Sequence, residues 1–121
     1  MYAEGNKAYR EMYGIILNHR FPALEIELVE DGTELARRLS NGGVANLQGV
    51  IANADLPGIS GEEVVKKYRG RQALENVPFI LYSPHDDGTL AQRASEIGAD
   101  AFVSRDKLIE SFRLMAAAGV K

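Results

Sequence analysis

The segment Ser83–Gly88 carries side chains of types that perform chemistry. Its sequence, Ser-Pro-His-Asp-Asp-Gly, offers a hydroxyl nucleophile in Ser83 and a histidine beside two carboxylates, which could form a metal or acid–base cluster. A serine nucleophile needs an adjacent base, however, and the nucleophile-elbow pattern is absent. Consecutive loop residues rarely converge on one ion, and no third ligand for His85 is evident. We therefore interpret this segment as a solvated loop.

The second histidine of the chain is not interpreted as catalytic either. His19, between Asn18 and Arg20 at a predicted helix end, is interpreted as a favourable charge near that helix end rather than a base.

The chain has no cysteine, which removes thiolate metal sites and cysteine nucleophiles and fits a reducing compartment. A net charge of −3 gives no basic footprint for nucleic acid. Apolar runs are short and the first residues lack a signal-peptide pattern, so we expect a cytoplasmic protein without membrane contact.

Helical and strand patterns alternate along the whole chain. Apolar spacing predicts that Tyr9, Met12 and Tyr13 face the core from a first helix, and Thr33 is placed to cap the second. Alternating apolar and acidic residues predict an edge strand at Leu24–Leu28, and continuous apolar character predicts a central strand at Leu47–Ala54. The predicted helices are Asn6–His19, Thr33–Ser40, Ser60–Tyr68, Leu90–Ile97 and Leu108–Met115, and the further strands are Phe79–Tyr82 and Ala101–Val103.

This alternation predicts one α/β domain over residues 1–121, with a parallel sheet covered by helices on both faces. Such sheets place their functional crevice beyond the carboxyl ends of the strands. That rule selects Asn53–Asp55, Ser83 and Ser104–Asp106 as the candidate site.

Two local motifs give the sequence a family resemblance that covers essentially the whole chain. Leu56–Gly61, Leu-Pro-Gly-Ile-Ser-Gly, and Gly98–Phe102, Gly-Ala-Asp-Ala-Phe, resemble the loops after the third strand and before the fifth strand of receiver domains of two-component response regulators. Asp31-Gly32 adds a weaker match. The resemblance implies a flavodoxin-like, doubly wound parallel sheet of five strands in the order 2-1-3-4-5.

The resemblance also assigns site positions. In active receivers an Asp four residues before the motif proline accepts a phosphoryl group, and an acidic pair after the first strand helps it to hold magnesium, a hard cation that prefers oxygen anions. Counting back from Pro57 gives Asn53, whose amide is no nucleophile toward phosphorus. The acidic pair falls at Glu4 and Gly5, so at most one carboxylate remains there.

Three further positions follow from the same resemblance. Ser83 keeps the hydroxyl at the end of the fourth strand, and the family's lysine aligns with Arg105, which is bulkier and planar. The following Asp106 replaces a cis proline, so we expect a trans bond and a reshaped loop. Phe102 aligns with the aromatic residue that changes rotamer on phosphorylation, although it could equally be a plain core residue.

The resemblance thus predicts a non-enzymatic pseudo-receiver of bacterial-type signalling that is not phosphorylated. Its expected partners are a histidine kinase or an output domain, and homodimerisation would use the fourth helix, fifth strand and fifth helix. We expect no cofactor. The alternative is a conventional phospho-accepting receiver in which Glu4 and Asp55 hold magnesium at a shifted or partial site. A flavodoxin-like ligand binder is disfavoured because no Gly- or Ser-rich phosphate loop follows the first strand.

The first strand is expected to be short, because only Met1–Ala3 precede Glu4. It could pair over few residues, lack native residues before Met1, or be completed by a partner chain, and the sequence leaves these three open.

Overall fold

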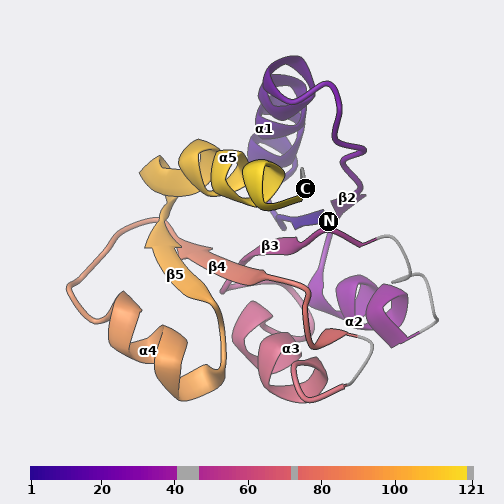
Figure 1. Cartoon of the computed structure of the whole chain (residues 1–121). Helices are drawn as coiled ribbons and strands as arrows, with labels where there is room; N and C mark the ends of the chain where they lie inside the picture. The colour runs from indigo at the N-terminus through magenta and orange to yellow at the C-terminus, as the bar shows by residue number, and fades with distance from the viewer. Residues whose placement is uncertain (41–46, 72–73, 120–121) are drawn as a thin grey trace.

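The computed structural model describes residues 1–40, 47–71 and 74–119, with the side chains of 117–119 left aside (Figure 1). Its five strands are all parallel and lie in the order β2-β1-β3-β4-β5, which confirms the predicted flavodoxin-like, doubly wound sheet. The strands are β1 (Tyr2–Ala3), β2 (Leu28–Val29), β3 (Val50–Asn53), β4 (Phe79–Ser83) and β5 (Ala101–Ser104), and the helices are α1 (Lys7–Arg20), α2 (Gly32–Ser40), α3 (Gly61–Tyr68), α4 (Leu90–Ile97) and α5 (Leu108–Gly119).

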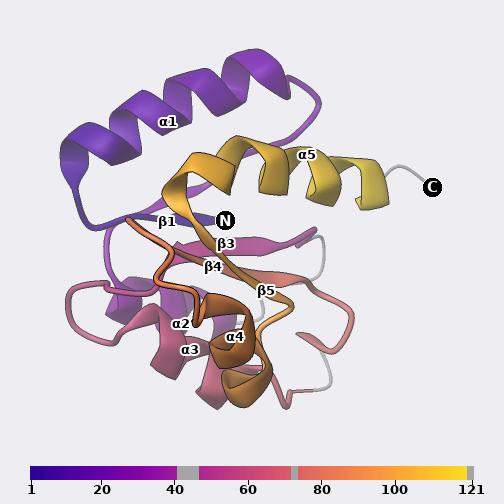
Figure 2. The same cartoon turned by 90° about the vertical axis from the view of Figure 1, so that its left-hand side faces the viewer.

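The helices form two layers around the sheet. Helices α1 and α5 cover one face, and α2, α3 and α4 cover the other (Figure 2). Each face has its own apolar cluster: Leu17, Ile51 and Phe112 pack under α1 and α5, whereas Val65, Leu81 and Ile97 pack on the opposite side. In the part of the chain that the structure describes, no helix is long and apolar enough to cross a bilayer.

Strand β1 is short, as expected, yet it is an interior strand that pairs with β2 and β3. Tyr2 pairs with Leu28 on one side and Ile51 on the other, and both residues of the strand are fully buried. The Tyr2 amide donates to the Glu27 carbonyl at 2.8 Å. The pairing over two residues is enough to place Glu4 at the carboxyl end of the sheet, between the ends of its neighbours.

The predicted edge strand at Leu24–Leu28 is wrong in extent, since β2 comprises only Leu28–Val29. The physical reason is the length of β1, which offers only two residues for pairing, so most of the segment before Leu28 has no ladder to join. The central strand is likewise shorter than predicted, beginning at Val50 rather than Leu47.

Two further local predictions need correction. Tyr9 and Met12 are 37% and 45% exposed, so the buried stripe of α1 passes through Gly14 and Leu17 instead. The predicted cap Thr33 lies inside α2. The Asp31 carboxylate caps that helix, accepting from the Glu34 amide at 2.7 Å.

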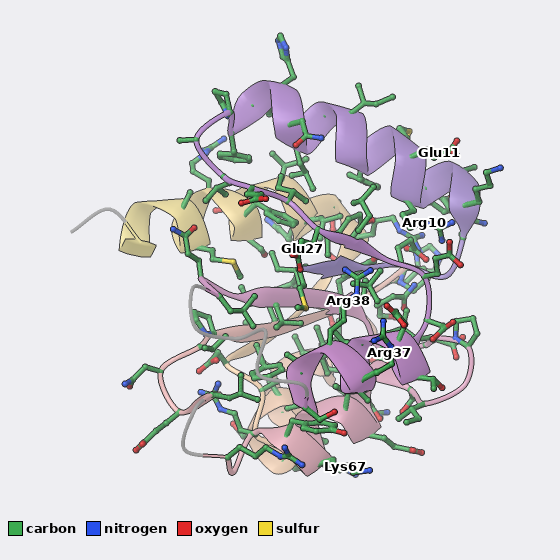
Figure 3. All side chains as sticks on the ribbon, turned by 90° about the vertical axis from the view of Figure 1, so that its right-hand side faces the viewer. Arg10, Glu11, Glu27, Arg37, Arg38 and Lys67 are labelled. Carbon is green, nitrogen blue, oxygen red and sulfur yellow. The ribbon has the colours of Figure 1, made fainter. Side chains whose placement is uncertain are left out.

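One ion pair joins Glu27, just before β2, to the outer surface of α2, where two further pairs lie within the helix (Figure 3). Arg38 lies 3.8 Å from the Glu27 carboxylate and 2.8 Å from that of Glu34, which also binds Arg37. Exposed pairs of this kind contribute at most about 1 kcal/mol each. These ion pairs therefore add little to the stability of this edge of the sheet.

Asp100, within the Gly-Ala-Asp motif, has a structural task. Its carboxylate accepts from the Phe79 amide at 2.7 Å and from Arg69 at 2.9 Å, and Arg69 also donates to the Val77 carbonyl. It therefore joins the start of β4 to the end of α3.

We expect Asp100→Ala to lower the free energy of unfolding by about 1–3 kcal/mol, because it removes a charge-assisted bond to a backbone amide at the start of a central strand. Urea unfolding followed by circular dichroism measures this. Asp55→Ala, which truncates an exposed aspartate, is the control and should change stability by less than about 0.5 kcal/mol. Equal losses for the two variants would contradict the role of Asp100.

Candidate functional site

The carboxyl edge of the sheet gathers most of the residues that the sequence selected. Asn53 ends β3, Ser83 ends β4, Arg105 follows β5, and Glu4 follows β1. In the structure, Asn53 and Arg105 both contact the Glu4 carboxylate. Asp55, Ser83 and Phe102 line a separate hollow.

Glu4 is the centre of the first group. It is 2% exposed, and the Tyr82 hydroxyl donates to its Oε1 at 2.5 Å. The main-chain amide of Asn6 donates to Glu4 Oε2 at 3.0 Å, and the Arg10 guanidinium donates to the main-chain carbonyl of Glu4 at 2.9 Å. A buried carboxylate needs such donors, because burial removes the water that would otherwise solvate its charge. Glu4 is thus anchored at both oxygens.

Asn53 is also engaged at both ends of its amide. Its Nδ2 lies 3.4 Å from each Glu4 oxygen, and its Oδ1 accepts from the Asp55 amide at 2.9 Å. The side chain is buried at 7% exposure. An amide suits this place because it donates to Glu4, whereas a carboxylate there would face a second carboxylate at contact distance.

Arg105 supplies the positive charge opposite Glu4. Its Nη2 lies 3.5 Å from Glu4 Oε1, and its side chain is 18% exposed. The guanidinium lies over the Tyr9 ring at 4.1 Å and near the Tyr82 ring at 5.8 Å. Among the described residues, its buried Nε has no hydrogen-bond partner. Charge and ring contacts therefore hold this side chain more than hydrogen bonds do. The loop after β5 forms a 3₁₀ turn, and the Arg105–Asp106 peptide bond is trans.

Sequence reasoning missed Tyr9 and Tyr82 as site residues. Tyr82 and Tyr2 share a hydrogen bond at 3.3 Å, and burial raises the pKa of both phenols above the usual value, so both stay protonated at neutral pH. A signal for Tyr82 was available, because a residue next to Ser83 on a strand must point to the opposite face of the sheet. Tyr9 carried no such signal.

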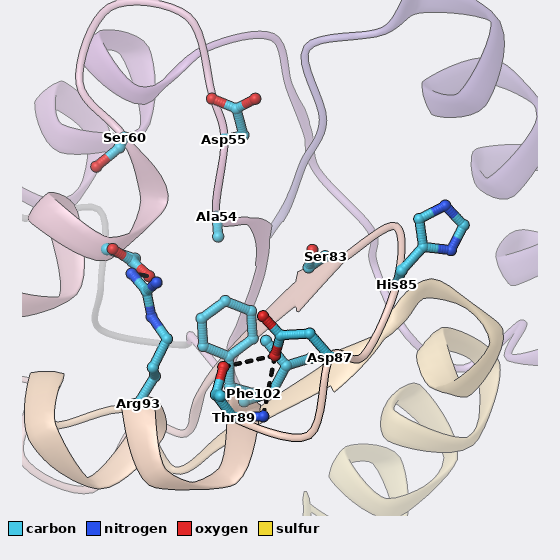
Figure 4. Close-up of a pocket in the computed structure, with 11 residues that line it drawn as sticks. Ala54, Asp55, Ser60, Ser83, His85, Asp87, Thr89, Arg93 and Phe102 are labelled. Atoms are coloured by element: carbon cyan, nitrogen blue, oxygen red, sulfur yellow. Dashed lines mark hydrogen bonds and ion pairs between the residues drawn. The ribbon is translucent and has the colours of Figure 1, made fainter.

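The separate hollow has a volume of about 340 Å³ and lies between the loop after β3 and the start of α4 (Figure 4). Ser83 and the buried Phe102 line it, as does the Glu62–Arg93 ion pair. His85 and Asp87 also line it, and the Asp87 carboxylate accepts from Thr89. Asp55 also lines this hollow, whereas Glu4 does not.

The second acidic position of the family's pair is constrained by packing. A Cβ atom on Gly5 would lie 2.7 Å from Pro57 Cδ, so a side chain there would require the loop Leu56–Gly61 to shift. Within residues 1–40, 47–71 and 74–119, no three His, Asp or Glu side chains are grouped closely enough to hold a metal ion.

Comparisons with known proteins identify the family. The model of the response regulator receiver domain matches residues 1–118. The chain is 30% identical over 66 residues to the chemotaxis protein CheV2 of Helicobacter pylori, an alignment that spans 54% of this chain and only 21% of that relative.

Solved structures agree in fold. The receiver domain of a signal transduction histidine kinase from Syntrophus aciditrophicus is 25% identical, with 99% of this chain and 89% of that chain covered and a TM-score of 0.77. The chemotaxis response regulator CheY4 of Vibrio cholerae is 19% identical, with 94% of each chain covered and a TM-score of 0.75. The chain therefore belongs to the response regulator receiver domain family.

Proposed function

We propose that this receiver domain signals in a bacterial cytoplasm by docking to protein partners, without accepting a phosphoryl group. It would act as a non-enzymatic module that binds a histidine kinase or an output domain. The observation that carries the proposal is the side chain at the acceptor position. Asn53 offers an amide instead of a carboxylate, and that amide is directed at Glu4.

The surroundings of Asn53 support the same conclusion. Phosphoryl transfer to a receiver needs a metal held by several carboxylates to neutralise developing charge. Here Glu4 already contacts Arg105, Gly5 has no side chain, and the exposed Asp55 lines the other hollow. These residues do not fit a magnesium ion, which favours the docking role over the alternative of a shifted or partial metal site.

The face formed by α4, β5 and α5 is the docking surface that we propose. A hollow of about 370 Å³ lies there, lined by Phe102, Lys107 and Leu114 among others, and Leu114 is 65% exposed. The same face could join two copies of this chain. A monomer mass in light scattering at high concentration would exclude homodimerisation of the isolated domain.

Treatment with acetyl phosphate and magnesium, read by intact mass, tests the central claim. We expect the wild type to gain no phosphoryl mass, because Asn53 has no acceptor oxygen that can attack phosphorus. The matched variant combines Asn53→Asp with Arg105→Lys and so restores the two residue types that active receivers use. Labelling of that variant would show that the assay detects a working site in this fold.

A phosphoryl adduct on the wild type would overturn the proposal. Fragmentation of the adduct would then identify the acceptor, and Asp55 is the residue that the alternative requires.

A further inference from the structure

We infer that the Arg105 guanidinium, which lies against the Tyr9 ring, neutralises the Glu4 carboxylate and thereby keeps divalent cations out of this site. The inference rests on the proposed function and adds to it how the pocket is closed. It predicts that an acidic residue at position 53 does not by itself recreate a cation site.

The first argument is electrostatic. Glu4 is 2% exposed, and a buried carboxylate without a nearby positive charge is strongly destabilising. The Arg105 guanidinium is 3.5 Å from Glu4 Oε1, whereas the other nearby cation, Arg10, binds the main-chain carbonyl of Glu4. A guanidinium keeps its charge at every physiological pH. The carboxylate therefore already has a counter-ion, and a metal would have to displace it.

The second argument is geometric. The Tyr9 ring lies 4.1 Å from Arg105 Cζ, so the first turns of α1 cover the guanidinium from outside. Tyr82 contacts the same group from inside at 5.8 Å and donates to Glu4. Cation–π contacts of this kind stabilise a guanidinium, and more strongly when it is desolvated. They also explain why Arg105 stays in place although its buried Nε has no hydrogen-bond partner among the described residues.

Competition between Mg²⁺ and Arg105 for Glu4 can be measured as the midpoint temperature of thermal unfolding in millimolar MgCl₂, compared with that in NaCl of equal ionic strength. Three variants are compared with the wild type: Asn53→Asp, Asn53→Asp with Arg105→Met, and Asn53→Asp with Arg93→Met. Methionine keeps an apolar stem against the Tyr9 ring and removes the charge. Arg93 is the control because it pairs with Glu62, outside the Glu4 network.

We expect Mg²⁺ to leave the wild type unchanged and to raise the midpoint of Asn53→Asp little. It should raise the midpoint of the Arg105→Met combination by roughly 4 °C or more, because binding to the native state alone stabilises it. The Arg93→Met combination should behave like Asn53→Asp. If the Arg105→Met combination does not fold, Arg105→Gln replaces it in the same comparison.

Two results would overturn the inference. One is an equal response of Asn53→Asp with and without Arg105, which would show that the guanidinium excludes nothing. The other is an unfolding temperature of the Arg105→Met combination that Mg²⁺ does not raise. That result would show that the surrounding loops, and not the guanidinium, keep Mg²⁺ out. Neither depends on phosphorylation, so the inference and the proposed function fail separately.

Discussion

Replacement of Gly32 by alanine is expected to lower the free energy of unfolding by about 3 kcal/mol. Gly32 begins α2, and its amide donates to the Pro57 carbonyl at 3.0 Å. A Cβ atom at this position would lie well inside van der Waals contact with the carbonyl oxygen of Ile59. Because the obstacle is backbone, no side-chain rotation relieves it, and overpacking of this kind costs about 1–3 kcal/mol or more.

The effect is measured by urea unfolding with circular dichroism, since the chain has no tryptophan to report by fluorescence. Gly70→Ala is the matched control, because a Cβ atom there would meet nothing within 4 Å. That variant should be neutral or more stable by up to about 1 kcal/mol, through a less flexible unfolded chain. If Gly32→Ala were as stable as Gly70→Ala, the close contact between Gly32 and the loop Leu56–Gly61 would not contribute to the free energy of unfolding.

The same contact shows what the sequence could and could not predict. Asp31-Gly32 and Leu56–Gly61 were informative as motifs because both are needed where two loops touch at the carboxyl edge of the sheet. Element order and strand order followed from alternation and resemblance. Strand length did not, because the extent of β2 depends on how many residues β1 offers, which is a property of the pair.

The candidate site was predicted in part. Glu4, Asn53 and Arg105 were selected by position along the chain, and in the structure Asn53 and Arg105 both contact Glu4. The sequence did not reveal that Tyr9 covers Arg105, because helical spacing indicated a core residue and gave no direction for a ring near the helix start. Asp55 was selected by its proximity to Asn53 in the chain, but its side chain serves the neighbouring hollow.

The second large effect is expected at Glu4. We predict that Glu4→Ala lowers the free energy of unfolding by about 3 kcal/mol, because breaking a buried ion pair from one side leaves an uncompensated charge. The Arg105 guanidinium would lose its counter-ion, and the Tyr82 hydroxyl and the Asn6 amide would lose their acceptor. Urea unfolding of the variant provides the measurement. Glu34→Ala, which also truncates a glutamate bound to arginines but on the exposed face of α2, should show no comparable loss.

A double variant separates the charge from the hydrogen bonds. If most of the loss in Glu4→Ala comes from the stranded guanidinium, adding Arg105→Met should recover stability, and the double variant should be more stable than Glu4→Ala alone. Simple addition of the two single losses would contradict this, because it would mean that Glu4 and Arg105 contribute independently. Recovery would instead show that the two charges are retained as a pair, so that removing either one alone costs more than replacing both.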